Sequence, residues 1–307
     1  MKTALAQGNN KKAIGISALL LAALIWGAEF AVMKDVLYSI GPNLMNTVKY
    51  ILGEVLFTVV FFKRIIKATK NDIKGGIITG VFIGFGNAFQ AMGLTTVSVT
   101  VNAFLSAIYV LLIPFIVWII YKTAPTRRIF LCAFLAIAGT VLLSTGGDFS
   151  DVIFHRGEIL TLVAACFYSF VIISIDRYAR EIDPIILTIL QSYVATVLSV
   201  VFTFALEGTP DYKINGILVI QFLFMAIFAV MLTQLLMNYG MRYVTATHAG
   251  IIFPTEGVFA SVFAFVFLGE AVTGVMFLGS AFIAAGIIIL EIGPAAQGNN
   301  RSAQIPK

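Results

Sequence analysis

Long apolar runs separated by short polar turns dominate the pattern of this chain. A helix needs about 20 apolar residues to cross the hydrocarbon of a bilayer. The runs predict ten such helices, at 13–36, 43–64, 74–93, 99–121, 129–146, 157–177, 184–206, 215–239, 247–268 and 273–292. Turn residues mark the breaks, as in "SIGPN" and "EGTPDYKING". The pattern therefore predicts an all-α integral membrane protein, whose polar tails at 1–12 and 293–307 are expected to be disordered.

The composition agrees with a membrane protein and excludes several other classes. Of the 307 residues, 60% are hydrophobic and 11% are charged, and the mean hydropathy of +0.99 is too high for a water-soluble domain. The basic residues lie in short loops and form no continuous patch, so we expect no nucleic-acid partner. Cys132 and Cys166 fall inside apolar runs without metal-ligand spacing, and we expect both to be packing residues. No phosphate-binding loop motif is present, and we expect no cofactor and no catalytic residue.

The distribution of Lys and Arg predicts the orientation. Loops on the side of the N-terminus hold sixteen of the twenty basic residues, Lys49 lies inside a predicted span, and the other side holds only Lys34, Arg156 and Lys213. Basic residues concentrate on the cytoplasmic side of membrane proteins. We therefore expect both termini in the cytoplasm and a location in a bacterial-type inner or plasma membrane.

An internal repeat divides the chain. A shift of 147 residues aligns Gly93 to Leu143 with Gly240 to Leu290 without gaps, and Gly139 then coincides with Gly286. Each half holds five spans, an odd number, so the second half enters the membrane from the opposite side. This predicts two inverted five-helix repeats, at 13–146 and 157–292, which a connecting loop at 147–156 joins. Such repeats place a binding site between the halves near the middle of the membrane.

Three segments resemble a known family, the EamA type of the drug/metabolite transporter superfamily. "LLLAALIWGAEFAVMKDV" resembles the opening Trp-Gly helix of that family, and "GPNLMNTVKYILGEV" resembles its second helix. "MRYVTATHAGIIFPTEGVFASVFAFVFLGEAVT" resembles its most recognisable segment, which ends in Leu-Gly-Glu. The resemblance covers residues 13–292. The chain departs from the family at "YKTAPTRR", where Leu-Gly-Glu often recurs, and at Lys49 and Glu54, where an Arg and a small residue are common.

The resemblance implies a secondary transporter that works by alternating access. Members move amino acids, other metabolites, nucleotide sugars or organic cations, so the cargo stays open. We favour export of an amino acid or related metabolite, with a proton as a candidate coupling ion and an organic-cation or drug exporter as the alternative. A lipid-processing membrane enzyme fits less well, because the loops lack a cluster of catalytic or metal-binding residues. We expect a monomer in the lipid bilayer and leave a dimer open.

Charged residues inside the predicted spans are candidates for function. Glu29 and Lys49 lie at a similar depth in the first two spans, which leaves two readings open: an ion pair, or contact with substrate. Lys49 and Glu54 lie five residues apart, about 140° around a helix, and should not pair on one face. Glu54 and Glu256 lie deeper, with no partner evident from the sequence, and are candidates to bind a substrate cation or a proton.

Amides occupy equivalent positions in the two halves. The 147-residue shift maps Gln234 onto Asn87 and Glu256 onto Tyr109. Helical spacing places Asn87 and Gln90 on one face, and Gln234 and Asn238 on another. Such amides form interhelical hydrogen bonds in many bundles, but four of them in symmetric spans favour a polar cavity. Candidate ring residues for a cage around a cationic solute are Trp26, Tyr109, Trp118 and Tyr168.

The segment "IIFPTEGVFASVFAFVFLGE" combines two costly features in an apolar run. Pro254 removes a helix hydrogen bond, and an unsatisfied backbone group is tolerated at this depth only beside protein or water. We therefore expect a helix break at a cavity, where Glu256 binds a substrate ammonium or the coupling proton. In "GGIITGVFIG", Gly76, Gly80 and Gly84 predict close helix packing within the molecule rather than a dimer contact.

Overall fold

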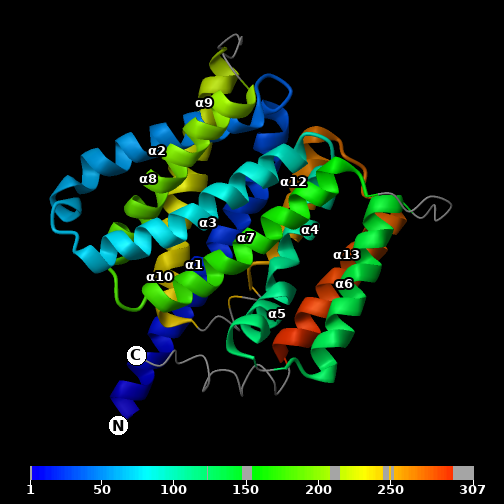
Figure 1. Ribbon diagram of the computed structural model, residues 1–307, viewed down its shortest axis with the longest axis horizontal. Coiled ribbons are helices and arrows are strands. Elements are labelled where there is room, and N and C mark those ends of the chain that lie inside the picture. Colours follow the sequence, from blue (N-terminus) through cyan, green and yellow to red (C-terminus); the bar gives the residue numbers. More distant parts are fainter. Residues whose placement is uncertain are drawn as a thin grey trace.

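A computed structural model of the protein describes residues 2–122, 124–146, 154–207, 215–244, 249 and 252–292 (Figure 1). Every regular element in these ranges is a helix. The predicted C-terminal tail and most of the predicted connecting loop, residues 147–153, lie outside the described residues.

The first half contains five helical segments. They are α1 (Lys2–Val36), α2 (Pro42–Ile65), α3 (Lys70–Leu94), the consecutive α4 (Val99–Ala107) and α5 (Tyr109–Tyr121), and α6 (Arg127–Thr145). The structure corrects the predicted N-terminal tail, because α1 extends back to Lys2. The segment "KTALAQGNNKK" contains no proline, and Ala, Leu, Gln and Lys favour a helix on both sides of Gly8, Asn9 and Asn10.

The second half repeats this order with π-helical turns at several places. Its segments are α7 (Arg156–Tyr178), α8 (Pro184–Phe202) with η1 (Thr203–Glu207), α9 (Gly216–Phe224) with η2 (Met225–Leu232) and α10 (Thr233–Tyr243), α12 (Thr255–Phe263) with η3 (Ala264–Leu268), and α13 (Gly274–Ile292). The described residues therefore form ten helical segments, and each of them overlaps a predicted span.

The outer surface of the bundle suits lipid rather than water. Seven helical stretches are long and apolar enough to cross a membrane, and Thr255–Leu268 and Gly274–Ile289 are shorter apolar helices. Large apolar side chains point outward, among them Val59, Phe204 and Phe267, each at least 70% exposed. Because a soluble protein rarely exposes so much apolar surface, the fold is that of an integral membrane protein.

Helix contacts relate the two halves by an approximate twofold axis. Helix α1 of the first half packs against α10 and α12 of the second half. Its counterpart in the second half, α7, packs against α3, α4 and α5 of the first half. The pairs α2 with α8 and α6 with α13 map onto themselves when the halves are exchanged, and α6 and α13 lie side by side in Figure 1. With five segments in each half, the repeats run in opposite directions through the membrane.

Glycines permit equivalent close approaches in the two halves. A Cβ atom on Gly93 of α3 would lie 2.9 Å from the carbonyl oxygen of Gly157 in α7. At the related crossing, a Cβ atom on Gly240 of α10 would lie 3.1 Å from the carbonyl oxygen of Gly15 in α1. A larger residue at these places would push the backbones apart, so the glycines bring the cavity-lining helices together across the repeat boundary.

The structure confirms the predicted role of the glycine steps in α3. Added Cβ atoms on Gly76, Gly80 and Gly84 would meet α8, so these glycines serve packing within the molecule. Cys132 is buried as predicted, but Cys166 is exposed and is not a core residue. An apolar helix surrounded partly by lipid carries no sequence pattern that separates its buried face from its lipid face, which explains the error for Cys166.

Candidate functional site

A cavity lies between the two repeats and contains most of the predicted site residues. Nine of the predicted candidates line it: Trp26, Glu29, Lys49, Asn87, Gln90, Tyr109, Tyr168, Gln234 and Glu256. The remaining lining residues are Phe30, Met33, Tyr50, Ile83, Val171, Ile172, Ala229, Val230, Met237 and Phe253. Both repeats therefore contribute to one cavity, which is mainly apolar and has a small number of polar groups, as is usual for a solute site.

Four predicted candidates lie outside this lining: Glu54, Asn238, Pro254 and Trp118. The carboxyl group of Glu54 is buried between α2 and α8, with the Ser192 hydroxyl as its polar neighbour. Asn238 donates a 2.8 Å hydrogen bond to Thr188 and so links α10 to α8. Pro254 directly precedes α12 and is its N-terminal cap residue.

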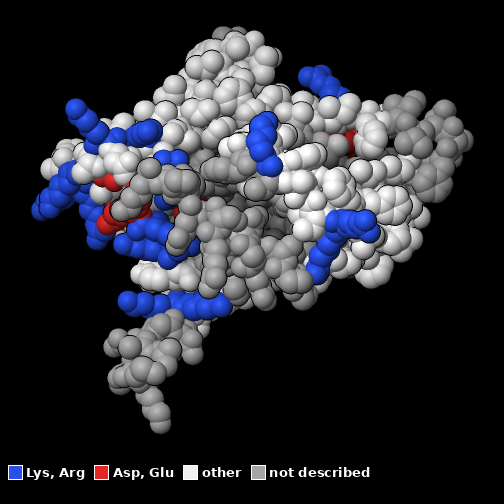
Figure 2. Space-filling view, turned by 60° about the horizontal axis from the view of Figure 1, so that its bottom comes forward, with Lys and Arg blue, Asp and Glu red and all other residues white. Residues whose placement is uncertain are grey.

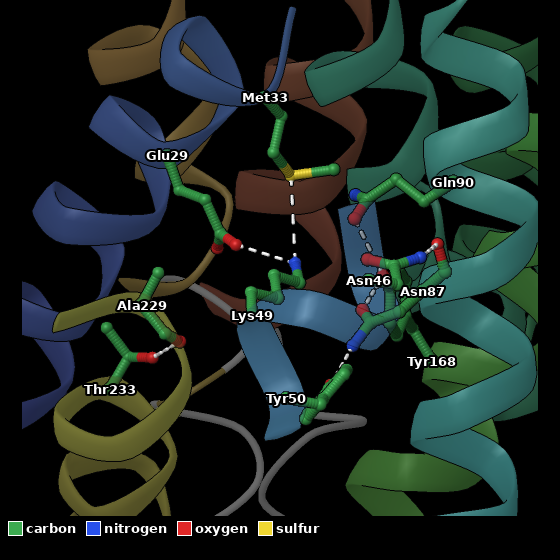
Figure 3. A network of polar contacts seen from close by, with 10 residues as sticks. All are labelled: Glu29, Met33, Asn46, Lys49, Tyr50, Asn87, Gln90, Tyr168, Ala229 and Thr233. Atoms are coloured by element: carbon green, nitrogen blue, oxygen red, sulfur yellow. Dashed lines mark hydrogen bonds and ion pairs between the residues drawn. The ribbon is translucent and has the colours of Figure 1, made fainter. Parts of the chain in front are cut away.

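A buried ion pair occupies the first half of the cavity wall. Lys49 Nζ lies 2.7 Å from Glu29 Oε1, and their side chains are 4% and 10% exposed. The sulfur of Met33 lies 3.9 Å from the same nitrogen, and Figure 3 shows the Lys49 side chain pointing toward both partners. The predicted ion pair is thus present. Because burial removes the hydration of both groups, the loss of either partner would leave a costly unpaired charge.

A hydrogen-bond network lies beside this ion pair (Figure 3). Asn87 donates to the hydroxyl of Tyr50, and its side-chain oxygen lies 2.6 Å from the hydroxyl of Tyr168. The Tyr168 hydroxyl also lies 2.7 Å from Gln90 Oε1, and Asn46 donates to the Asn87 carbonyl oxygen at 3.1 Å. The network joins α2, α3 and α7, so it fixes the first half of the wall to a helix of the second repeat.

The second half of the wall has fewer polar contacts. Gln191 of α8 donates a 2.9 Å hydrogen bond to Gln234 of α10. Most of the remaining lining from this repeat is aliphatic, from Val171 and Ile172 to Ala229, Val230 and Met237.

Glu256 is the acidic group of this second half. It is the second residue of α12, it is buried, and the Glu29 carboxylate is close enough to repel its charge. The ion pairs among the described residues are Lys49–Glu29, Arg64–Asp183 and Arg180–Asp176, which do not include Glu256. The cavity lining thus holds two carboxyl groups and one ammonium group, so it suits a solute that brings a positive charge.

Aromatic rings surround the charged groups. Trp26 packs against Phe253 with 5.7 Å between ring centroids, and Tyr109 meets Tyr168 edge to face at 6.3 Å. Three of the four predicted ring residues therefore line the cavity, whereas Trp118 is not among the lining residues and is 39% exposed.

The sequence analysis did not single out Tyr50, Met33 or Phe253 as site residues. Tyr50 directly follows Lys49 and is fully buried, and Phe253 directly precedes Pro254. Their neighbours in the sequence were a usable signal, because a residue next to an intramembrane charge or a helix break lies close to the same cavity.

Comparisons with known proteins agree with this fold. The model of the EamA-like transporter family matches residues 13–145 and again 155–292. A protein of Archaeoglobus fulgidus named as an uncharacterized transporter is 32% identical over 274 residues, which cover 89% of this chain and 84% of the relative. YoaV of Bacillus subtilis, also named as an uncharacterized transporter, is 24% identical over 284 residues, with 88% and 94% of the two chains covered.

A solved crystal structure shares the fold, with a TM-score of 0.61 at 16% sequence identity and with 97% of this chain and 99% of that chain covered. At this identity the likeness supports the arrangement of helices alone. The two matches to the family model coincide with the two halves that the contacts relate by twofold symmetry. The chain therefore belongs to the EamA-like transporter family.

Proposed function

We propose that this transporter exports a small organic solute, an amino acid or a related metabolite, by alternating access of the central cavity. The Lys49–Glu29 ion pair is the observation that carries this proposal. A zwitterion offers the same two charges, so its carboxylate can take the place of Glu29 at Lys49 while its ammonium meets a cavity carboxylate. A buried pair of opposite charges at the boundary between the repeats can thus exchange its internal partner for a solute.

The cavity also supports a second candidate, an organic cation. Glu256 has no basic partner among the ion pairs of the described chain, and the rings of Trp26, Tyr109 and Tyr168 border the same space. Aromatic faces and a carboxylate attract ammonium groups. Such a solute would use Glu256 without opening the pair at Lys49.

We further propose that a proton drives transport through one of the buried carboxyl groups, Glu256 or Glu54. A carboxyl group inside a membrane protein can exchange a proton with a water-filled cavity when the conformation changes. The chain acts in this proposal as a carrier, because the polar groups of the cavity bind and orient a solute that leaves unchanged.

Flux measurements on purified protein in proteoliposomes test these proposals. The assay uses a panel of amino acids and of organic amines, with and without a pH gradient. Lys49→Met is expected to abolish amino-acid flux and to spare amine flux if a folded fraction is assayed at matched amount. Lys67→Met, the same change outside the cavity, is the control. Equal loss of both solute classes in Lys49→Met would contradict a carboxylate subsite at Lys49, and no flux of either class would contradict both candidates.

We propose that both termini lie in the cytoplasm. We also propose that the protein is a monomer in a bacterial-type inner membrane. Single cysteines placed at Gly8 and Asn299, with Cys132 and Cys166 replaced by Ala, report on the orientation. An impermeant thiol reagent should label neither position in intact cells and both after permeabilisation. Labelling of either position from outside would reverse the orientation.

A further inference from the structure

A second, shallow groove lies on the outside of the bundle along the first turns of α3. Lys70 and Lys74 line it together with Ile73, Ile77 and Ile78. The opposite face of the same turns is buried, where Gly75 and Gly76 pack against the end of α7 and against α8. The groove is therefore separate from the central cavity and opens to the surroundings of the bundle.

The two lysines of this groove keep their charge available. Two acids of this region have other partners: Asp72 accepts hydrogen bonds from the backbone and hydroxyl of Thr69 as part of a capping box, and Asp183 pairs with Arg64. Lys70 and Lys74 are exposed and take no part in the ion pairs of the described residues. An anion that enters the groove therefore meets two ammonium groups one helical turn apart.

The order of residues in the groove matches that of a phospholipid. Lys70 lies at the start of α3, and Ile78 follows eight residues later, which is about 12 Å along a helix. The charged end thus lies at the membrane surface, and the isoleucines continue toward the hydrocarbon. A water-soluble anion would gain nothing from exposed isoleucines, whereas a lipid places its phosphate on the lysines and its acyl chain on the isoleucines.

The wider charge pattern supports an anionic headgroup. Lys63 and Arg64 lie in the last turn of α2, and Lys67 lies in the turn between α2 and α3, shortly before the groove. Figure 2 shows Lys and Arg side chains gathered at one edge of the molecule, where the α2–α3 and α7–α8 turns lie. Clusters of this size next to a membrane helix attract anionic lipids.

We propose that Lys70 and Lys74 of α3 bind the headgroup of an anionic phospholipid, whose acyl chain lies along Ile73, Ile77 and Ile78. The bound lipid covers the outer face of the helix whose later turns carry Asn87 and Gln90 into the cavity. It therefore supports the position of α3 at its N-terminal end.

Native mass spectrometry of the full chain in detergent tests the site with phosphatidylglycerol and phosphatidylcholine as probes. The wild-type protein should retain phosphatidylglycerol more strongly than phosphatidylcholine. Lys70→Gln/Lys74→Gln should lower phosphatidylglycerol affinity by roughly thirtyfold, from the contribution of two lysines near an anionic headgroup. Lys63→Gln/Lys67→Gln removes the same charge outside the groove and should lower it much less. Lys70→Arg/Lys74→Arg keeps both positive charges and should retain phosphatidylglycerol binding. That result would show that the two positions tolerate substitution.

Three outcomes would overturn the proposal. Equal losses in the two Gln pairs would show a diffuse attraction without a groove site. Equal retention of the two lipids by the wild-type protein would remove the charge selectivity. Displacement of phosphatidylglycerol by millimolar inorganic phosphate would identify a site for a free anion. If the Lys70→Gln/Lys74→Gln protein does not fold, Ile73→Ser/Ile77→Ser must reduce binding while leaving the lysines in place, and unchanged binding there also overturns the lipid site.

Discussion

The two halves of the cavity wall share one frame and differ in chemistry. An offset of 142 residues relates α1 and α2 to α7 and α8, and the offset of 147 residues relates the later segments. Under these offsets, equivalent residues line the cavity from both sides: Trp26 with Tyr168, Ile83 with Val230, Asn87 with Gln234, Gln90 with Met237, and Tyr109 with Glu256. The twofold frame therefore extends to the direction of individual side chains.

The charged groups break this symmetry. Glu29 corresponds to Val171, Lys49 to Gln191, and Glu256 to Tyr109. The first half thus holds the ion pair and the second half holds the lone acid. A symmetric frame lets the bundle open toward either side of the membrane, while an asymmetric lining gives a bound solute one preferred orientation. Variants at equivalent positions of the two halves can therefore test the helix arrangement and the charged residues of this site separately.

Breaking the ion pair should have the largest effect. Lys49→Met or Glu29→Gln leaves one buried charge without its partner, and each should lower the free energy of unfolding by about 3 to 5 kcal/mol. The double variant removes both charges and should recover much of that loss. Reversible unfolding in detergent micelles measures all three variants.

The control for this experiment is the equivalent change in the other half, Gln191→Met. It removes a neutral hydrogen bond to Gln234 and should cost about 1 kcal/mol. Strictly additive losses in the Lys49 and Glu29 variants would show that the 2.7 Å contact contributes no coupling, and equal losses for Lys49→Met and Gln191→Met would remove the contrast between the halves.

Replacing Glu256, the acid of the second half, should lower transport rather than the stability of the fold. Glu256→Gln preserves shape and most hydrogen bonding but removes the charge, so an ammonium or a proton loses its partner. We expect flux to fall at least about tenfold, from the loss of a charged contact worth about 1.5 to 3 kcal/mol, or to lose its dependence on pH. Proteoliposome flux at several pH values measures this.

Tyr109→Phe tests the equivalent position and should leave the pH dependence of flux intact. The Glu256→Gln protein should also elute and insert like the wild-type protein. If Glu256 only satisfies nearby backbone groups, the Gln variant transports normally at every pH, and the residue has a packing role.

The amide pair offers a smaller contrast. Asn87→Ala breaks contacts to Tyr50 and Tyr168 and leaves the buried Tyr50 hydroxyl without its donor, while Tyr168 keeps its contact to Gln90; this should cost about 1 to 2 kcal/mol. Gln234→Ala removes one hydrogen bond to Gln191 and should cost less. Thermal unfolding of the two variants, measured side by side, checks the order. The reverse order would show that the second half of the wall depends more on its polar contacts.

Much of the fold follows from the sequence, because each span must be apolar over the full thickness of the bilayer. The ten segments could be predicted. An ion pair of Glu29 and Lys49 was one of two readings that the sequence left open, since a charge inside a membrane needs a partner at its own depth. The internal shift also predicted that Asn87 and Gln234 are equivalent, and the structure brings both to one cavity.

Direction around a helix was harder to predict. Glu54, like Glu256, is an acidic residue inside an apolar span, yet the structure buries it between α2 and α8 rather than in the cavity. Cys166 faced a similar ambiguity. In a helix that contacts lipid on one side and protein on the other, both faces are apolar, so the rotation of the helix is set by tertiary packing that no local pattern encodes.

The smallest effect is expected for Pro254. The structure places it before α12, where Glu256 N donates to Phe253 O at 2.8 Å and Gly257 N donates to Pro254 O at 3.1 Å. The first half has the same kind of tight turn between α4 and α5, where Ile108 N donates to Leu105 O at 3.3 Å. The residue equivalent to Pro254 there is Ala107. An alanine thus permits the break in the first half.

Pro254→Ala should therefore preserve the turn and the position of Glu256, and it should alter turnover more than binding. Loss of a conformationally suitable proline lowers the free energy of unfolding by about 0.5 to 1 kcal/mol, and a small change in turnover is expected from the greater freedom of the break. Transport kinetics should show this change in the maximal rate with an unchanged half-saturation concentration. The matched variant Ala107→Pro tests the frame from the other side, since a proline tolerated at one break should be tolerated at its equivalent. If Ala107→Pro fails to fold while Pro254→Ala folds, the two breaks are alike in hydrogen bonding but differ in the packing around them. A shift in half-saturation for Pro254→Ala would instead show that the proline itself positions the acid.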